Sequence, residues 1–216
     1  MKLLTFYNSK KICSVAIKYN NKIDYIYKFS EKNNHSTILL MINKILLKNF
    51  ISLKDINYIA FSKGPGSFTG IRIAIIIAQG LSIGLNIPLI GISTLKILAE
   101  KGKQITKKNK FLIITKANKK NIYFGKYIYK KNNIFLINKE KFISIQLALF
   151  KIQKLKNWIM IKNFNSITFN SIKNIKILNI KNINALDIIP IALRYIKFKK
   201  YKKKKIIPNY LQNKII

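Results

Sequence analysis

Hydrophobic and polar residues alternate at the start of the chain in a pattern typical of β-strands. The pattern predicts three strands, at residues 3–7, 12–19 and 22–29. Asn20 and Asn21 separate the last two strands, and asparagine tolerates the positive φ that a two-residue hairpin turn requires. The chain therefore opens with three strands, of which the last two form a hairpin.

Helical periodicity follows this hairpin. Five apolar residues recur at helical spacing and form one stripe of a helix predicted over residues 35–48, namely Ile38, Leu39, Ile42, Ile45 and Leu46. Residues 52–55 resemble a small capping box, and Ser144 is suited to cap a later helix. Strands at 58–61 and 87–92 are each followed by a helix, and these helices end near residues 85 and 101. Residues 102–110 are polar and lysine-rich, which favours a linker.

The second half repeats the order of the first. Strands are predicted at 111–117, 122–130, 134–138 and 158–164, and helices at 144–155 and 185–199, with Pro190 as a kink in the last helix. Both halves then run strand-strand-strand-helix-strand-helix. We predict an α/β protein of the actin-like (ASKHA) type, with two ribonuclease H-like βββαβα half domains at 1–101 and 102–216.

Composition makes the chain strongly basic. Its 216 residues include 42 basic and 6 acidic ones, for a formal charge of +36. Arginine occurs at Arg72 and Arg194 alone, so lysine stands where forked arginine contacts to phosphate would be expected. The lysines are scattered among many Ile and Asn residues, and all three types share A/U-rich codons, so we interpret much of the excess as nucleotide bias. Weak, non-specific RNA binding is predicted whether the basic excess reflects nucleotide bias or selection for binding.

Composition and hydropathy also limit which metal sites and disulfides the protein can have and where in the cell it is expected. One Cys and one His exclude a disulfide framework and a histidine-cluster metal centre. The apolar stretch at 71–92 is interrupted by polar residues and proline, and its continuous core is shorter than the about 20 residues that a bilayer requires. Residues 1–17 do not match a signal peptide. We therefore expect a buried helix, no membrane and a cytoplasmic protein.

A glycine-rich loop between a predicted strand and a predicted helix is the sharpest local signal. It comprises Gly64, Pro65, Gly66, Ser67, Phe68, Thr69 and Gly70, with Arg72 just beyond. Its glycines allow a tight turn and close backbone approach, and Ser67 or Thr69 is suited to cap the helix. Two interpretations stay open, a structural turn and a phosphate site at a helix N-terminus. The lysine and hydroxyl that end a P-loop are missing.

The helix after this loop carries a row of small side chains. Gly70, Ala74, Ala78 and Ser82 recur every four residues, so they share one face that another helix can approach closely. Apolar residues surround this row nearly all the way round, which predicts partners on more than one side. The row packs either onto the protein's own sheet or against another subunit.

These motifs resemble the bacterial TsaB (YeaZ) family, the accessory subunit of the tRNA threonylcarbamoyladenosine machinery. The resemblance rests on residues 64–72, 78–81 and 87–95, with support from residues 13–16, from His35 and Ser36, and from the Pro-Asn-Tyr-Leu at 208–211. It covers about residues 1–100 strongly and residues 131–205 hardly at all.

The resemblance implies a non-catalytic subunit. It would pair directly with the related catalytic subunit TsaD, and the ATPase TsaE would join them. Together they would transfer threonylcarbamoyl from threonylcarbamoyl-AMP to N6 of the adenosine next to the anticodon, in tRNAs reading codons that begin with A. The chain itself would bind no cofactor, because ATP is handled by the partner subunits, and it would meet tRNA through the complex.

The resemblance also implies where the partner binds. The first helix and the helix after the glycine loop would form the partner surface, with residues His35, Ile38, Leu39, Ile42, Gly70, Ala74, Ala78 and Ser82. The same helices suit a homodimer, and this alternative stays open.

Catalytic chemistry is hard to place in this chain. The carboxylates show neither a close pair nor metal-ligand spacing, and they are Asp24, Glu31, Asp55, Glu100, Glu140 and Asp187. Tyr7 and Asn8 stand where relatives have Asp-Thr, which argues against a magnesium-ATP site. Lys116 and Asn118 stand in place of the outer residues of the family's Asp-Ala-Arg. Cys13 lies in an apolar strand and is expected to be buried.

Two rival functions remain. A basic, standalone RNA-binding protein is supported by the aromatic segment 123–129 and by the lysine cluster 199–205, although the segment departs from the RNP1 pattern. An autonomous actin-like kinase or peptidase would need acidic metal ligands near the first strand and the glycine loop, and the sequence lacks them there.

Overall fold

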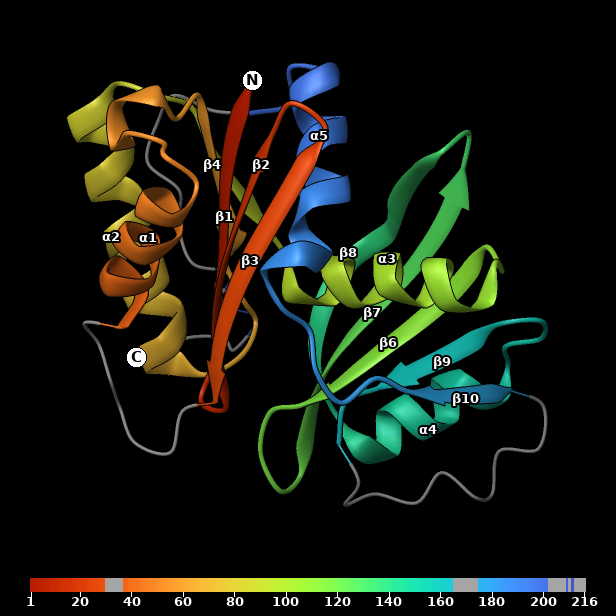
Figure 1. The fold of residues 1–216 in the computed structure, drawn as a ribbon. Coiled ribbons are helices and arrows are strands. Elements are labelled where there is room, and N and C mark those ends of the chain that lie inside the picture. Colours follow the sequence, from red (N-terminus) through yellow and green to blue (C-terminus); the bar gives the residue numbers. More distant parts are fainter. Residues whose placement is uncertain (30–36, 165–174, 202–208, 210, 212–216) are drawn as a thin grey trace. The chain divides into compact units, whose positions relative to one another are not determined.

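The computed structural model describes residues 1–29, 37–164, 175–201, 209 and 211 (Figure 1). The chain forms two compact units, of which the first comprises Met1–Thr94 and Ile183–Asn209, and the second Leu95–Asn182. Each unit has a five-stranded mixed sheet. The predicted α/β class with two similar halves is therefore confirmed.

The sheet of the first unit follows the predicted meander. Its strands are β1 (Lys2–Asn8), β2 (Ile12–Tyr19), β3 (Lys22–Phe29), β4 (Tyr58–Ser62) and β5 (Leu89–Ile92). Their order is β3-β2-β1-β4-β5, with β1, β2 and β3 antiparallel and with β4 and β5 parallel to β1. Asn20 lies in the hairpin turn with φ of 49°, as predicted from its tolerance of the left-handed region.

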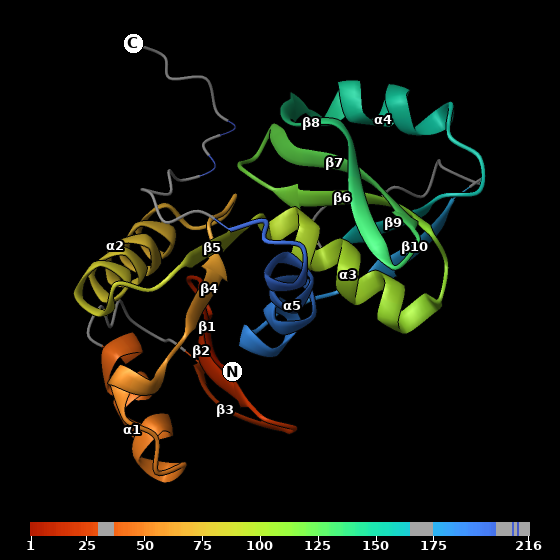
Figure 2. The ribbon, with the colours of Figure 1, turned by 90° about the horizontal axis from the view of Figure 1, so that it is seen from above.

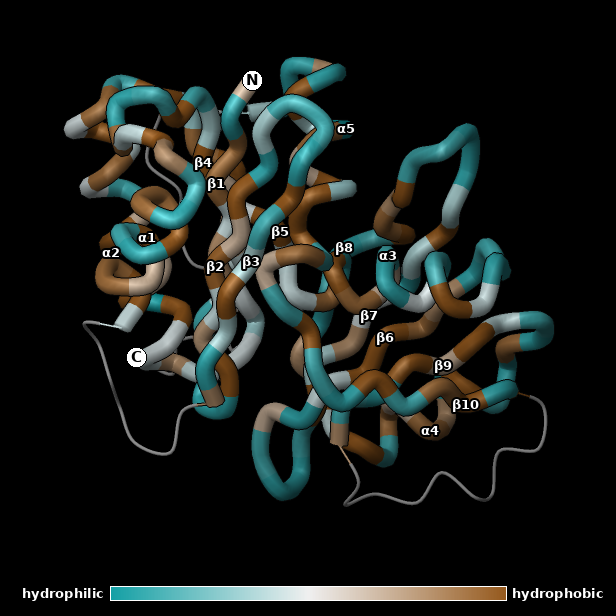
Figure 3. The backbone as a smooth tube through the Cα atoms, in the orientation of Figure 1, coloured by the Kyte–Doolittle hydropathy of each residue, from teal (hydrophilic) through white to brown (hydrophobic). Residues whose placement is uncertain are grey.

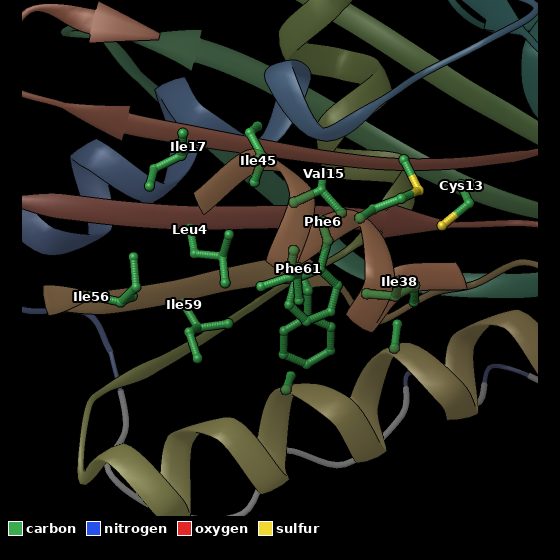
Figure 4. Close-up of a cluster of buried hydrophobic side chains, with 14 of the residues drawn as sticks. Leu4, Phe6, Cys13, Val15, Ile17, Ile38, Ile45, Ile56, Ile59 and Phe61 are labelled. Carbon is green, nitrogen blue, oxygen red and sulfur yellow. The ribbon is translucent and has the colours of Figure 1, made fainter. Parts of the chain in front are cut away.

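Two helices, α1 (Thr37–Lys48) and α2 (Phe68–Leu85), cover one face of this sheet (Figures 1 and 2). The space between them and the sheet is filled by buried aliphatic and aromatic side chains (Figure 4). Phe6 and Phe61 stack at its centre, with ring centroids 5.9 Å apart. Between the two helices, the short 3-10 helix η1 (Leu53–Asp55) begins with the predicted capping box, in which Ser52 and Asp55 bond reciprocally.

The other face of the first sheet is bound by a segment from the end of the chain. The segment consists of the 3-10 helix η2 (Ala185–Ile188) and α5 (Ile189–Lys197). The Thr5 hydroxyl donates to the Ala185 carbonyl at 2.9 Å, and the Ser14 hydroxyl accepts from the Ala185 N–H at 2.9 Å. Because these groups are buried, they fix the segment against β1 and β2 without leaving a polar atom unpaired.

The predicted single helix over 185–199 with a kink at Pro190 is wrong in its form. Asn184 and Asp187 form a capping box around η2, and a separate α-helix begins at Ile189 with Pro190 in its first turn. An N–H in the first turn has no intrahelical acceptor, so a proline there removes no hydrogen bond. Pro190 therefore starts α5 instead of bending it.

The second unit has the same topology as the first. Its strands are β6 (Lys110–Lys116), β7 (Asn121–Lys130), β8 (Asn133–Ser144), β9 (Ile159–Lys162) and β10 (Lys176–Asn179). Their order, β8-β7-β6-β9-β10, corresponds strand for strand to that of the first sheet. Its helix α4 (Ile145–Gln153) begins at the predicted cap, where the Ser144 hydroxyl accepts from the Leu147 N–H. In Figure 3, β6 and β9 are mainly hydrophobic and the turn after β7 is hydrophilic.

The predicted linker at 102–110 is wrong. The helix α3 (Thr94–Thr106) runs through most of it, and β6 begins at Lys110. Gly102 is buried, and a Cβ there would meet Ile161 and the Phe111 ring. Lys103 lies on α3, and Lys107, Lys108 and Lys110 are exposed in the turn and at the start of β6 that follow it, so local polarity did not mark a boundary.

The division of the chain also differs from the predicted half domains 1–101 and 102–216. The chain enters the second unit at Leu95, where α3 begins to pack on the second sheet, and returns to the first unit at Ile183. In the first unit, the sheet face opposite α1 and α2 is covered by α5, which follows the last strand of the second unit. In the second unit, the sheet face opposite α4 is covered by α3, which follows the last strand of the first unit. The first unit is therefore completed by residues from near the end of the chain.

Replacing Ser14 with alanine is expected to lower the free energy of unfolding by about 1–3 kcal/mol, because the buried Ala185 N–H loses its acceptor. Equilibrium urea unfolding measures this change. Thr115→Val is the matched control, since the Thr115 hydroxyl is buried and makes no hydrogen bond within the described part of the chain. This control is expected to be neutral or stabilising, and equal losses in the two variants would contradict the role of Ser14.

Candidate partner-binding site

The glycine loop is held by the protein's own backbone. Gly64 has a φ of 94°, and a Cβ there would lie 2.8 Å from the Ile71 side chain. The Gly64 carbonyl accepts from the Thr94 N–H at 2.8 Å, and the Lys63 carbonyl accepts from the Asn209 N–H at 2.9 Å. The tight turn is thus required by contacts inside the first unit, and binding of a phosphate there stays a prediction.

The start of α2 is packed closely against the end of β1. The Asn8 side chain donates to the Gly70 carbonyl at 3.2 Å, and a Cβ on Gly70 would lie 3.1 Å from the Asn8 carbonyl oxygen. Ser67 occupies the N-cap position, but its side chain makes no capping hydrogen bond. The predicted cap by Ser67 is therefore wrong in that respect, and the glycine at position 70 is explained by backbone contact.

The row of small residues on α2 faces its own sheet. Ala74 and Ala78 are 0% exposed and belong to the core of the first unit, and Gly70 is also buried. Ser82 is half-buried, and its hydroxyl donates to the Ile87 carbonyl at 2.6 Å. Gly70, Ala74 and Ala78 therefore contact the protein's own sheet, and a role of this row in binding a partner stays a prediction. A bulky side chain at Ala78 would consequently disrupt the monomer itself.

The predicted residues on α1 divide in the same way. Ile38 and Ile42 are 1% and 3% exposed and pack into the core, whereas Leu39 is 50% exposed. His35 lies outside the described residues. Of the predicted partner-binding residues on α1, the structure therefore leaves Leu39 accessible and places Ile38 and Ile42 inside.

The outward sides of α1 and α2 carry large apolar residues, most of which lie outside the predicted stripe and the row of small residues. We call these residues the exposed helix face, and they are Leu39, Leu40, Leu47, Phe68, Ile76 and Ile83. Ile76 and Ile83 are 67% and 81% exposed. The Arg72 guanidinium lies 3.7 Å from the centre of the Phe68 ring and holds one end of this face in a cation–π contact.

Two helical glycines lie beside these residues. Gly80 and Gly84 are four residues apart, and a Cβ added to either would meet nothing within 4 Å. A glycine inside a helix costs about 0.5–1 kcal/mol relative to alanine, and contacts within the protein do not require it at these positions. The four-residue spacing of Gly80 and Gly84 among apolar residues is the sequence signal that marks this pair.

The hydropathy of α2 fits this two-sided arrangement. Within the described chain, α2 is the one helix long and apolar enough by composition to cross a membrane, with a mean hydropathy of 1.7 over 18 residues, of which 28% are buried. One side packs on the sheet through Ile71, Ala74, Ile75 and Ala78. The remaining apolar surface belongs to the exposed helix face.

The acidic residues in the described part of the chain serve structural roles. Asp24 and Asp55 pair with Lys48 and Lys2 at 2.8 and 3.1 Å, and these lysines hold the pKa of both carboxyls below the ordinary value. Asp187 belongs to the η2 capping box, and Glu140 accepts a hydrogen bond from Tyr127. Among the described residues, His, Cys, Asp and Glu form no cluster that could hold a metal ion.

The remaining candidate groups are unsuited to acid–base chemistry. Burial raises the pKa of Tyr7 to about 12 and that of Cys13 to about 11, so both are neutral near pH 7. Asn118 accepts from the backbone N–H groups of Lys120 and Asn121 and shapes the turn after β6. Tyr7 and Cys13 are thus packing residues, and Asn118 is a turn residue.

The aromatic segment 123–129 does not form an open stacking platform. Phe124 and Tyr127 are 4% and 1% exposed, and they lie on opposite faces of β7 because strand residues alternate. Tyr123 packs against Phe142, with ring centroids 5.8 Å apart. The rival RNA-binding function therefore loses the feature that best supported it.

Comparison with known proteins gives consistent results. The protein family described as "TsaD: tRNA N6-adenosine threonylcarbamoyltransferase" matches residues 28–205. The tRNA threonylcarbamoyladenosine biosynthesis protein TsaB of Buchnera aphidicola subsp. Baizongia pistaciae is 41% identical over 98% of both chains. TsaB of subsp. Schizaphis graminum is 44% identical over 74% of this chain and 81% of its own. TsaB of Escherichia coli is 34% identical over 62% and 58%, respectively.

Solved structures agree in fold. YeaZ from Pseudomonas aeruginosa matches 97% of this chain and 99% of its own with a TM-score of 0.78 at 22% identity. A second crystal structure, of a protein with similarity to peptidase YEAZ from Pseudomonas aeruginosa, has a TM-score of 0.82 at 22% identity over 98% and 99% of the two chains.

Fold and sequence together define an actin-like (ASKHA) α/β protein with two halves of equal topology. Within this class the chain belongs to the TsaB (YeaZ) family, whose members are named for tRNA threonylcarbamoyladenosine biosynthesis. This result confirms the resemblance on which the functional expectations rest.

Alanine at Gly70 and at Gly80 is expected to change stability in opposite directions. Gly70→Ala places a methyl group against the Asn8 backbone and should lower the free energy of unfolding by about 1–3 kcal/mol. Gly80→Ala meets open space and should raise it by about 0.5–1 kcal/mol. Urea unfolding of both variants checks the assignment of the two sides of α2, and a destabilising Gly80→Ala would contradict it.

Proposed function

We propose that this chain is the non-catalytic subunit that works with TsaD and TsaE in tRNA threonylcarbamoyladenosine formation in the cytoplasm. The complex transfers threonylcarbamoyl from threonylcarbamoyl-AMP to N6 of the adenosine next to the anticodon, in tRNAs reading codons that begin with A. ATP is handled by the partner subunits. Membership of the TsaB family supports this role.

The exposed helix face is the observation that carries the proposal. Its apolar side chains stand in water in the monomer, and covering apolar surface is favourable by about 25 cal/mol per Å². Several large exposed apolar side chains on two helices that cover the same sheet face are typical of a protein–protein interface. Gly80 and Gly84 leave room beside Ile76 and Ile83 for the backbone of a partner helix. We assign this face to the direct contact with TsaD.

This assignment replaces the partner-binding residues expected from the sequence. The partner still binds α1 and α2 in this proposal. Among the described residues predicted from the sequence to bind it, Leu39 is the one that lies on the exposed helix face. The other contact residues lie on the outward side of each helix. Ile76 is two residues from the buried Ala74, which corresponds to a rotation of about 200° around α2. A second copy of the chain would use the same face, so a homodimer and the pairing with TsaD exclude each other.

The chemistry of transfer is assigned to the partner. The described carboxylates are engaged in ion pairs, caps and buried hydrogen bonds, and Tyr7 occupies the position where actin-like ATPases hold their metal–nucleotide. General acid–base work needs a group with a pKa near the working pH, whereas burial moves the pKa of Tyr7 and Cys13 away from neutrality.

Reconstitution tests the proposal directly. Purified chain, TsaD and TsaE are incubated with threonylcarbamoyl-AMP, ATP and unmodified tRNA, and each protein is omitted in turn. We expect no modified adenosine from the chain alone, and a loss of at least about tenfold in product when the chain is left out. Turnover by the chain unaided, or full activity without it, would refute the proposal.

Ile76→Glu is expected to weaken co-elution with TsaD by at least about tenfold while the monomer stays folded. The reason is that a carboxylate at the centre of an apolar interface would be desolvated without a partner. Ile105→Glu is the matched control, because Ile105 is 54% exposed on α3 in the second unit. Size-exclusion chromatography measures both variants, and equal co-elution of Ile76→Glu and wild type would remove the exposed helix face from the interface.

A further inference from the structure

The second unit carries a basic surface on its own elements. Lys126 on β7, Lys141 on β8 and Lys151 on α4 come from three different elements. The Lys126 ammonium lies 5.9 Å from the centre of the Trp158 ring, just before β9. We call these four residues the lysine–tryptophan surface.

The sheet register places these groups on one face. Lys141 pairs with Phe124 across β7 and β8, and directly opposed residues point to the same side of a sheet. Phe124 is part of the core beneath α4, and Lys126 follows it by two residues on the same strand. Trp158 packs against this core too. Lys126, Lys141 and Lys151 therefore gather around α4, on the face that α4 covers in part (Figure 2).

The three positive charges repel one another. Burial lowers the pKa of Lys126, and the charges of Lys151 and Lys141 lower it further. Like charges this close destabilise the fold unless an anion lies between them. One turn beyond Lys151, the Lys154 ammonium lies 4.4 Å from the centre of the exposed Phe150 ring, which continues the same combination of cation and aromatic ring along α4.

The second unit offers little acidic charge to balance this surface. Glu100 and Glu140 are the acidic residues of 95–182, and both are buried, at 3% and 8% exposure. Glu140 accepts from Tyr127, whose side chain points to the α3 face because it is one residue from Lys126 on β7. Glu100 lies on α3, which covers that opposite face (Figure 2).

We propose that the lysine–tryptophan surface binds the phosphate backbone of RNA. A polyanion with closely spaced charges relieves the repulsion among all three lysines at once, which a single monovalent ion does not do. Lysine contacts phosphate as a point charge without reading sequence, so the surface positions the RNA and leaves selection of the adenosine to other residues. The identity of that RNA as tRNA rests on the proposed function.

Trp158 makes the site observable because it is the one tryptophan of the chain. Phosphates bound at Lys126 change the electric field on the neighbouring indole and hence its fluorescence. The purified chain, without TsaD, is titrated with an unmodified tRNA transcript over a series of salt concentrations. Tryptophan fluorescence and the anisotropy of labelled tRNA are both recorded, and we expect the two signals to change with the same midpoint.

The test variant is K126Q/K141Q/K151Q, and the matched control is K10Q/K28Q/K54Q, which removes three exposed lysines of the first unit. Each phosphate contact contributes about 0.7–0.9 to the salt slope. The test variant should therefore lose about two to three units of slope and on the order of tenfold to a hundredfold in affinity at about 0.1 M salt. The control should lose less than half as much, with its fluorescence change retained.

Equal losses in the two triple variants would show that net charge alone binds RNA and would overturn the proposal. An unchanged Trp158 fluorescence in wild type under saturating tRNA would overturn it as well. Circular dichroism checks the fold, and the single variant Lys141→Gln, at an exposed position, should lose about one unit of slope even if the triple variant is unstable. Co-elution with TsaD should be unchanged in these variants, so failure here is separable from failure of the proposed function.

Discussion

Close packing of α2 against β1 and β4 is the constraint from which the rest of the first unit follows. The helix can approach the strands only because the residues beneath it are small, and Gly70 lies against the Asn8 backbone itself. The turn before it must then be tight, which explains the left-handed Gly64. The inner side of α2 is occupied by this contact, so several of its large apolar side chains point outward. The proposed surface for a partner is therefore a consequence of how the core is packed.

Periodicity in the sequence was sufficient for most strands and helices, whereas the strand β10 was not predicted. The meander over residues 2–29, the capping box at Ser52 and the cap at Ser144 were all predicted from local patterns, because their hydrogen bonds are made within a few residues. Residues that share a helix face were also identified. Periodicity cannot state which neighbour that face meets, and for this reason the sequence left both the protein's own sheet and another subunit open for the small residues of α2.

The errors in the second half have a related cause. The lysine excess made residues 102–110 look like a linker, although Gly102 is packed against Phe111 and Ile161. These contacts of Gly102 determine the structure of the segment, and the lysines around it gave no sign of them in the sequence. The same excess hid a more informative arrangement, since three lysines from separate elements converge only after β7, β8 and α4 have folded together.

The return of residues 183–209 to the first unit has a consequence for synthesis. On the ribosome, β1 to β5 and their two helices emerge early, but the sheet face that holds Thr5 and Ser14 keeps its polar groups open until Ala185 arrives. The N-terminal unit is thus the first to begin folding and among the last to be closed. A nascent chain that stops shortly after β10 would carry an incomplete first unit, in which the buried hydroxyls of Thr5 and Ser14 lack their Ala185 partner.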